Sequence, residues 1–253
     1  MARISSEALS ILKSAECSST QVKLPTAKLE RALYLEVNEV LDRLGGKWKG
    51  GKISAHLFPF DVSEQLQAVV ETGLLPPKNP DAFFPTPSWV IDEMIDHAGD
   101  LSNRTVLEPS AGLGAIADRI MKSYPSAKLD MVECNSFRAD VLRNKGYEVA
   151  ENDFMNITSA ITYDCILMNP PFSVATDKTA YISHILHAYD LLAEGGKLVA
   201  IAPVGFLGWR TDKKHVAFKK LVGGNYQELG KDTFKKSGTA VETVLLWLVK
   251  DSN

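Results

Sequence analysis

Short apolar runs alternate with helical segments from Thr105 to the end of the chain, and this alternation constrains the fold of the 253-residue sequence most. It is typical of βαβ units and predicts an α/β fold, a doubly wound, mostly parallel sheet. The predicted strands cover residues 104–108, 128–133, 147–151, 163–168, 197–202, 225–229 and 241–249. The predicted helices cover residues 114–123, 136–145, 179–193 and 212–222. Since the loop 233–239 joins the last two strands, we expect them to form an antiparallel hairpin at one side of the sheet.

The first 80 residues have a different pattern, and we expect them to form a small helical region. A basic hairpin is predicted at residues 47–57, where lysines flank a Gly-Gly turn. Helices are predicted at residues 6–16, at 26–44 and from 61 or 63 to 73. The proline-rich stretch 76–80 reads as a stiff linker. The sequence therefore predicts two domains, residues 1–80 and residues 81–253.

The composition is ordinary for a soluble globular protein, with 45% apolar residues. No apolar run is long enough to cross a bilayer and the first residues lack the apolar core of a signal peptide, so we expect a cytoplasmic protein with no membrane partner. Cys17, Cys134 and Cys165 are far apart in the sequence and the five His are scattered. We therefore expect neither a disulfide framework nor a metal site.

Positive charge is local, because the net charge is −3 while residues 208–236 carry eight Lys or Arg against three Asp or Glu. The negative total argues against a generally basic nucleic-acid coat protein. The basic stretch includes Arg210, Lys213 and Lys214, and it is a candidate for contacts with phosphates. The alternative interpretation is a solvated surface.

The tetrapeptide Asn169-Pro170-Pro171-Phe172 follows the predicted strand 163–168, which two prolines end abruptly. It is expected at the carboxyl edge of the sheet, where ligands bind in open parallel sheets. Asn169 offers a side-chain carbonyl oxygen and Pro170 a backbone carbonyl without an N–H of its own. Phe172 adds a flat apolar surface. Together they suit a planar group with an exocyclic NH2, such as adenine, cytosine, guanine or a glutamine amide.

The first strand of the predicted sheet ends in a glycine-containing turn, Glu108-Pro109-Ser110-Ala111-Gly112-Leu113-Gly114. The two glycines allow a close backbone approach by a ligand, but Gly-x-Gly alone is a weak signal. Glu133 closes the second strand 19 residues later, where an acid would accept both hydroxyls of a ribose. Asp153, after the third strand, could accept from an adenine amino group. The two acids together favour a nucleoside ligand.

These motifs resemble, in order, those of the S-adenosylmethionine-dependent adenine-N6 DNA methyltransferases, over roughly residues 83–249. The segment Phe83-Phe84-Pro85-Thr86-Pro87 is similar to the one that in this family closes over the methionine end of the cofactor. The resemblance implies a seven-stranded class I methyltransferase fold and S-adenosylmethionine as cofactor. The implied cofactor-binding residues are Phe84, Pro85, Thr86, Glu108, Pro109, Ser110, Ala111, Gly112, Gly114, Glu133, Cys134, Asp153, Phe154 and Asn169.

The implied reaction is direct transfer of a methyl group to an adenine that is turned out of the DNA duplex. Asn169, Pro170, Pro171 and Phe172 are the implied catalytic residues, and no metal is required. Implied for substrate binding are Phe172, Phe234, Arg210, Lys213 and Lys214. Because only 54 residues separate Gly114 from Asn169 and seven follow Leu246, we expect no separate target-recognition domain. We therefore expect a short or loosely defined DNA target.

Three other functions are open at this point. The same tetrapeptide type occurs in RNA base methyltransferases and, with Tyr in place of Phe, in methyltransferases of release-factor glutamine. Phe172 weighs against the glutamine group, and the segments 83–87 and 234–239 favour DNA over RNA. The third alternative is a non-catalytic protein that keeps the fold and binds cofactor or DNA.

Overall fold

The computed structural model describes residues 2–58, 61–76, 84–158, 161–174, 176–235 and 241–251. The chain divides into two compact units. The first contains Met1–Phe84 with Lys235–Thr239, and the second contains Pro85–Phe234 with Ala240–Asn253. The predicted linker 76–80 lies, apart from Pro76, outside the described residues.

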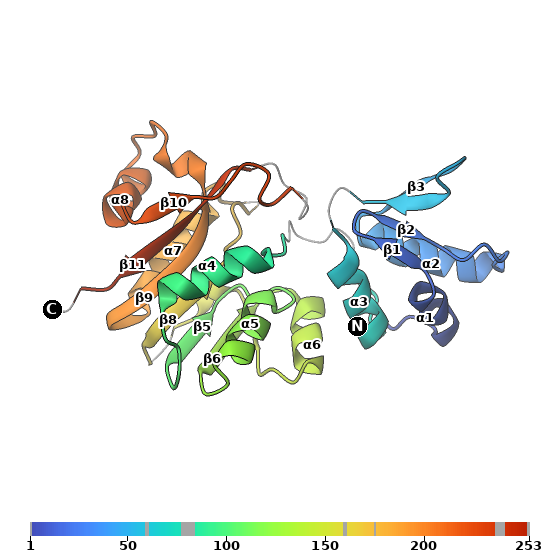
Figure 1. Cartoon of the computed structure of the whole chain (residues 1–253), viewed down its shortest axis with the longest axis horizontal. Helices are drawn as coiled ribbons and strands as arrows, with labels where there is room; N and C mark the ends of the chain where they lie inside the picture. The colour runs from blue at the N-terminus through green and yellow to red at the C-terminus, as the bar shows by residue number, and fades with distance from the viewer. Residues whose placement is uncertain are drawn as a thin grey trace. The chain divides into compact units, whose positions relative to one another are not determined.

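The second unit is built on a sheet that has seven strands in the described part of the chain (Figure 1). The order across the sheet is β10-β11-β9-β8-β5-β6-β7. The strands are β5 (Thr105–Glu108), β6 (Lys128–Glu133), β7 (Ala150–Glu151), β8 (Tyr163–Met168), β9 (Leu192–Pro203), β10 (Tyr226–Glu228) and β11 (Thr243–Val249). The five neighbouring strands β9, β8, β5, β6 and β7 pair in parallel. Strand β11 is antiparallel to both β9 and β10. The predicted fold class and terminal hairpin are thereby confirmed.

Helices cover both faces of this sheet. They are α4 (Ser88–Ala98), α5 (Ala115–Ser123), α6 (Ser136–Asn144), α7 (Ala180–Asp190) and α8 (Lys213–Val222), with the short 3-10 helices η1 (Phe154–Asn156) and η2 (Val204–Leu207). In Figure 1, α4 and α5 lie in front of the sheet and α7 lies behind it. Strands β5, β6, β8, β9 and β11 share one large apolar core with α7, α8 and η2, to which Ile166, Ala200, Leu246, Phe206 and Phe218 contribute.

The sequence pattern missed α4. Its buried residues are spaced as one helical stripe, namely Val90, Ile91, Met94, Ile95 and Ala98. The helix packs on the sheet, where His97 stacks on Trp247 of β11 with ring centroids 4.0 Å apart. Pro85 and Pro87 lie just ahead of this stripe and are typical of a loop.

Two strands, β9 and β7, differ most in length from the prediction. β9 begins at Leu192 instead of 197, because α7 already ends at Asp190 and Leu192 pairs with Tyr163 of β8. β7 has two residues instead of five, because Tyr147 still belongs to the turn that closes α6, with its N–H donating to Leu142 O at 3.1 Å.

The first unit contains α1 (Ser6–Lys13), α2 (Arg31–Arg43), α3 (Ser63–Thr72) and a four-stranded antiparallel sheet in its described residues. The strands are β1 (Glu16–Ser18), β2 (Gln21–Lys23), β3 (Lys47–Lys49) and β4 (Ala55–Leu57), in the order β1-β2-β4-β3. The predicted hairpin is present as β3 and β4, and the side chains of Lys47, Trp48 and Lys49 are exposed. The helix predicted for residues 6–16 is too long, since Glu16 instead starts a strand.

Neither a bilayer-spanning helix nor a metal-binding group of three or more His, Cys, Asp or Glu side chains occurs among the residues that the structure describes.

Candidate active site

The carboxyl ends of β8, β5 and β6 lie side by side, because the three strands are neighbours and run parallel. Glu108 ends β5, Glu133 ends β6 and Asn169 directly follows β8. The fold therefore brings three of the predicted site residues to one edge of the sheet, where open parallel sheets bind their ligands.

The glycine loop between β5 and α5 is fastened to the end of β6. Ala111 N–H donates to Val132 O at 3.0 Å, and Gly112 N–H donates to Glu133 Oε2 at 2.8 Å. Gly112 and Gly114 have φ angles of 57° and 88°, which strain residues with a Cβ. A Cβ on Gly114 would also lie 2.7 Å from a methyl carbon of Leu142. Glycine is thus required for this loop to pack as closely as it does on α6.

An arginine from the first turn of α6 holds the carboxylate of Glu133. Arg138 donates from Nε and Nη2 to Glu133 Oε1 at 3.1 and 2.8 Å, and Asn135 N–H donates to the same oxygen at 2.8 Å. Glu133 is 4% exposed. Cys134 Sγ is a fourth, weaker donor to Oε1 at 3.8 Å, whereas Oε2 accepts from Gly112 N–H. A ribose hydroxyl would therefore reach Oε2 more readily than Oε1, and the predicted acceptance of both hydroxyls stays a prediction. Sequence reasoning missed Arg138, because its bond to Glu133 forms only when the start of α6 folds against the end of β6.

Glu108 has its carboxyl group inside the protein and is 2% exposed. Burial raises the pKa of this carboxyl well above 4.5, against a hydrogen bond from Ala117 N–H that lowers it. Oε2 of Glu108 is buried without a hydrogen-bond partner among the described residues. Buried polar atoms are nearly always paired, so this oxygen fits a ligand that brings an N–H or O–H donor to the edge.

A second set of contacts fixes the glycine loop from the end of α6. Lys145 Nζ donates to Leu113 O at 2.7 Å and pairs with Asp118 Oδ2 at 2.6 Å. Tyr147 O–H donates to Asp118 Oδ1 at 2.8 Å. Sequence reasoning missed these residues as well, because they become neighbours only when the end of α6 lies beside the start of α5.

The residues predicted around the cofactor's adenine have different exposure. Asp153 is exposed and caps η1, where its carboxylate accepts from Met155 N–H at 3.0 Å. Cys134 is also exposed. Phe154 is buried against the rings of His184 and His187, so a ligand contact from this residue would use its backbone.

The amide of Asn169 is oriented by Thr86, a buried residue just ahead of α4. Asn169 Nδ2 donates to Thr86 Oγ1 at 3.1 Å. Because the amide is planar, this bond directs Oδ1 along its opposite arm. Pro170 is buried, Pro171 is partly exposed, and Phe172 packs against the large apolar core while staying partly exposed. The structure therefore places Thr86, predicted as a cofactor residue, in contact with the predicted catalytic residue.

The other predicted cofactor residues lie close to these along the chain. Pro109 is buried and Ser110 is partly exposed. Phe84 falls in the first unit and Pro85 in the second, and Phe83 lies outside the described residues.

Comparison with known proteins identifies the family of the domain that carries this site. Residues 90–215 match the family model of the methyltransferase small domain. These residues form a methyltransferase domain of the S-adenosylmethionine-dependent class. Over 196 residues it is 27% identical to the type II restriction enzyme and methyltransferase RM.BcgI of Heyndrickxia coagulans. That match covers 63% of this chain and 30% of the relative, so the methyltransferase spans about a third of the relative's length.

Two solved structures share the fold of the methyltransferase. The M protein of the type I restriction enzyme EcoKI matches with a TM-score of 0.55 and 16% identity, over 76% of this chain and 52% of that chain. PH1948 of Pyrococcus horikoshii, described as an RNA methyltransferase, matches with a TM-score of 0.52 and 19% identity, over 76% of this chain and 98% of that one. At such identities the likeness concerns the fold alone.

The residues at the sheet edge fit the cofactor of the methyltransferase. S-adenosylmethionine supplies an electrophilic methyl group on a sulfonium, and it carries an ammonium and two ribose hydroxyls as donors. The structure offers two buried carboxyl oxygens to such donors: Oε2 of Glu108, which has no hydrogen-bond partner among the described residues, and Oε2 of Glu133, which accepts from Gly112 N–H. The cofactor predicted from the sequence is confirmed by the family.

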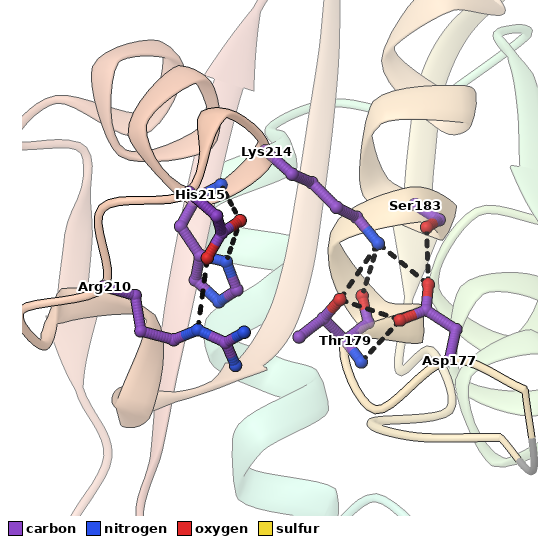
Figure 2. Close-up of polar contacts among 7 residues, drawn as sticks. Asp177, Thr179, Ser183, Arg210, Lys214 and His215 are labelled. Carbon is purple, nitrogen blue, oxygen red and sulfur yellow. Dashed lines mark hydrogen bonds and ion pairs between the residues drawn. The ribbon is translucent and has the colours of Figure 1, made fainter.

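On the other side of Asn169, the segment after Phe172 is tied to α8 (Figure 2). Lys214 Nζ pairs with Asp177 Oδ2 at 2.8 Å and donates to Thr179 Oγ1 at 3.0 Å, and Ser183 O–H donates to the same oxygen of Asp177 at 2.9 Å. The bond from Lys214 lowers the pKa of Asp177 below its usual range. Lys214, predicted to bind substrate, is therefore engaged within the protein.

The other predicted substrate residues differ in exposure and in pairing. Arg210 Nε pairs with Asp212 Oδ2 at 3.2 Å, and hydrogen bonds from His215 lower the pKa of Asp212 to about 2. Lys213 is exposed. Phe234 is 1% exposed, so its predicted stacking on a base would require the ring to leave the core. The substrate roles of these residues stay predictions.

Proposed function

We propose that this methyltransferase transfers a methyl group from S-adenosylmethionine to N6 of an adenine that is turned out of DNA. The Asn169–Phe172 turn at the carboxyl end of β8 carries this proposal. Its first residue, Asn169, has an amide oriented by Thr86, at the edge that also holds Glu108 and Glu133. An exocyclic amino group has two N–H donors and sits on a flat ring, which suits the Asn169 and Pro170 carbonyls and the ring of Phe172.

The proposed chemistry needs positioning more than activation. Hydrogen bonds from N6 to the two carbonyls draw its lone pair out of conjugation with the ring. That lone pair forms a bond to the methyl carbon as the carbon–sulfur bond breaks, the sulfur keeps the bonding electrons, and one N6 proton leaves to water. Oriented acceptors at a partly buried site contribute through fixed geometry and fixed dipoles.

DNA is the proposed substrate because of two supporting observations. A relative, RM.BcgI, combines a restriction enzyme with a methyltransferase, and the EcoKI M protein shares the fold. The hairpin of the first unit also exposes Lys47, Trp48 and Lys49, a combination of cations and an aromatic ring that suits contacts with a nucleic-acid strand. We propose that the first unit contributes DNA contacts and that the target is short, since phosphate contacts carry no sequence information.

The test is a transfer assay with tritiated S-adenosylmethionine and four acceptors: unmethylated duplex DNA, single-stranded DNA, RNA and protein. Labelled DNA is digested to nucleosides, and the expected product is N6-methyladenine. Sequencing of the methylated DNA then gives the target. Label confined to RNA or protein, or N4-methylcytosine as the DNA product, would overturn the proposal. The Asn169→Ala variant is the control for label carried by a contaminating enzyme.

A further inference from the structure

Trp209 is 99% exposed, in the loop of residues 208–212 between η2 and α8. The other exposed tryptophans, Trp48 and Trp89, are each about half covered, at 47% and 48% exposed. An indole is a large apolar surface that folding normally covers at least in part. The full exposure of this side chain therefore indicates that a ligand covers it.

The backbone on both sides of Trp209 is fixed. On one side, Lys219 Nζ donates to Leu207 O and Gly208 O, both at 3.0 Å. On the other side, Asp212 caps α8, and its Oδ1 accepts from His215 N–H at 3.2 Å and lies 2.9 Å from His215 Nδ1. The exposed ring is thus presented by a braced loop, so little ordering is left to a binding event.

This loop also lies at the edge of the sheet that carries Asn169. β9 runs parallel to β8, with Met168 paired to Ala200, so the carboxyl end of β9 at Pro203 lies at the same edge as Asn169. Trp209 follows that end by six residues. The start of α8, directly after the loop, is joined to the segment after Phe172 by the pair Lys214–Asp177 (Figure 2).

We propose that Trp209 stacks on a base of the DNA strand next to the target adenine. This inference rests on the proposed function, since it takes DNA as the substrate. Aromatic rings on a cationic surface bind bases of any sequence by stacking, because every base has a π face. The cations here are Arg210, with 58% of its side chain exposed, and exposed Lys213, both within four residues of Trp209. They are placed to contact phosphates of the stacked strand.

The test compares Trp209→Ala and Trp209→Phe with the wild type, in the presence of S-adenosylhomocysteine and a duplex that the wild type methylates. By fluorescence anisotropy, Trp209→Ala should raise the Kd for DNA about 5- to 100-fold, and Trp209→Phe should recover most of the affinity. The cofactor Kd and the Tm should stay unchanged, because this side chain is almost fully in solvent. Val249→Ala, at an exposed position at the opposite edge, is the matched control and should bind DNA as the wild type does.

A scan with single abasic sites locates the partner base. At the stacked position, the abasic site should weaken wild-type binding but leave Trp209→Ala binding unchanged, which is the non-additivity expected of a direct contact. If Trp209→Ala binds DNA as tightly as the wild type, and the wild type makes N6-methyladenine, the stacking contact is overturned and the proposed function stands. If Trp209→Ala binds DNA more weakly, and the wild type makes no N6-methyladenine, the stacking contact stands and the proposed function is overturned.

Discussion

The side of the sheet edge proposed to hold the cofactor (Glu108, Glu133 and the glycine loop), called the cofactor side, and the side proposed to hold the base (Asn169, Phe172 and Trp209), called the substrate side, are built differently. On the cofactor side, Glu108 and Glu133 are buried and Arg138 holds the carboxylate of Glu133. Glu133 and Lys145 in turn fasten the glycine loop. On the substrate side, Asn169 and Phe172 are partly exposed and Trp209 projects into solvent. A small cofactor of constant shape can be bound by a dense, buried set of hydrogen bonds. A large polymer has to be bound by exposed groups on loops whose backbone is fixed, and those contacts form only on binding.

The substrate side should control the chemical step. Replacing Asn169 by Ala removes one of the two proposed acceptors, so the rate of methyl transfer should fall about 100- to 1,000-fold. The Kd of the cofactor, measured by calorimetry, should change less than about twofold, because the Asn169 amide is proposed to bind the amino group of the base. An unaltered single-turnover rate in this variant would remove Asn169 from catalysis.

The cofactor side should control stability. Arg138→Ala leaves the buried carboxylate of Glu133 without its ion-pair partner, so the free energy of unfolding should fall by about 3–5 kcal/mol, with weaker cofactor binding. Arg143→Ala is the matched control on the same helix, because Arg143 pairs with Asp140 and Glu151 in an exposed setting. Its effect in urea unfolding should stay below about 1 kcal/mol. Equal losses in the two variants would contradict the difference between the two kinds of pair.

Glu108 should give the cofactor side a pH dependence. Its pKa is raised in the folded state, so the folded protein holds a proton that the unfolded chain releases near pH 4.5. The free energy of unfolding should therefore fall as pH rises above 4.5, by at most about 1.4 kcal/mol per pH unit from this group. Glu108→Gln removes this contribution, so its Tm relative to the wild type should rise between pH 5 and pH 8. The exposed control Glu148→Gln should show no such trend, and a parallel trend in both would contradict the assignment.

The pair Asp177–Lys214 should have the smallest effect, and it distinguishes two roles of Lys214. If Lys214 serves only to hold the loop, Asp177→Asn and Lys214→Met should both raise the Kd for DNA by roughly fivefold or less, as for a partly exposed pair. If Lys214 binds phosphate, Asp177→Asn should tighten DNA binding by releasing the cation, whereas Lys214→Met should weaken it and lower the salt dependence. Anisotropy titrations at several salt concentrations measure both quantities.

The strands and the Asn169–Phe172 turn could be predicted from the sequence because the signals for them lie within short segments. The run Tyr163–Met168 is apolar throughout because β8 is covered on both faces, and the prolines after Asn169 end it at a defined residue. The errors come from contacts between segments. The helix predicted for residues 6–16 stops at Lys13 because Glu16–Ser18 pairs with Gln21–Lys23, and the sequence of neither segment predicts that pairing.

By itself, the sequence determined the α/β class, the edge at which Glu108, Glu133 and Asn169 meet, and the methyltransferase family. These follow from periodicity and from residues that are adjacent in the chain. Only the tertiary structure decided that Arg138 and Lys145 hold the cofactor side, that Thr86 orients Asn169, that Lys214 is paired and that Phe234 is buried while Trp209 is not. Hydrogen bonds and burial depend on which distant segments fold against one another, and a one-dimensional pattern does not contain that information.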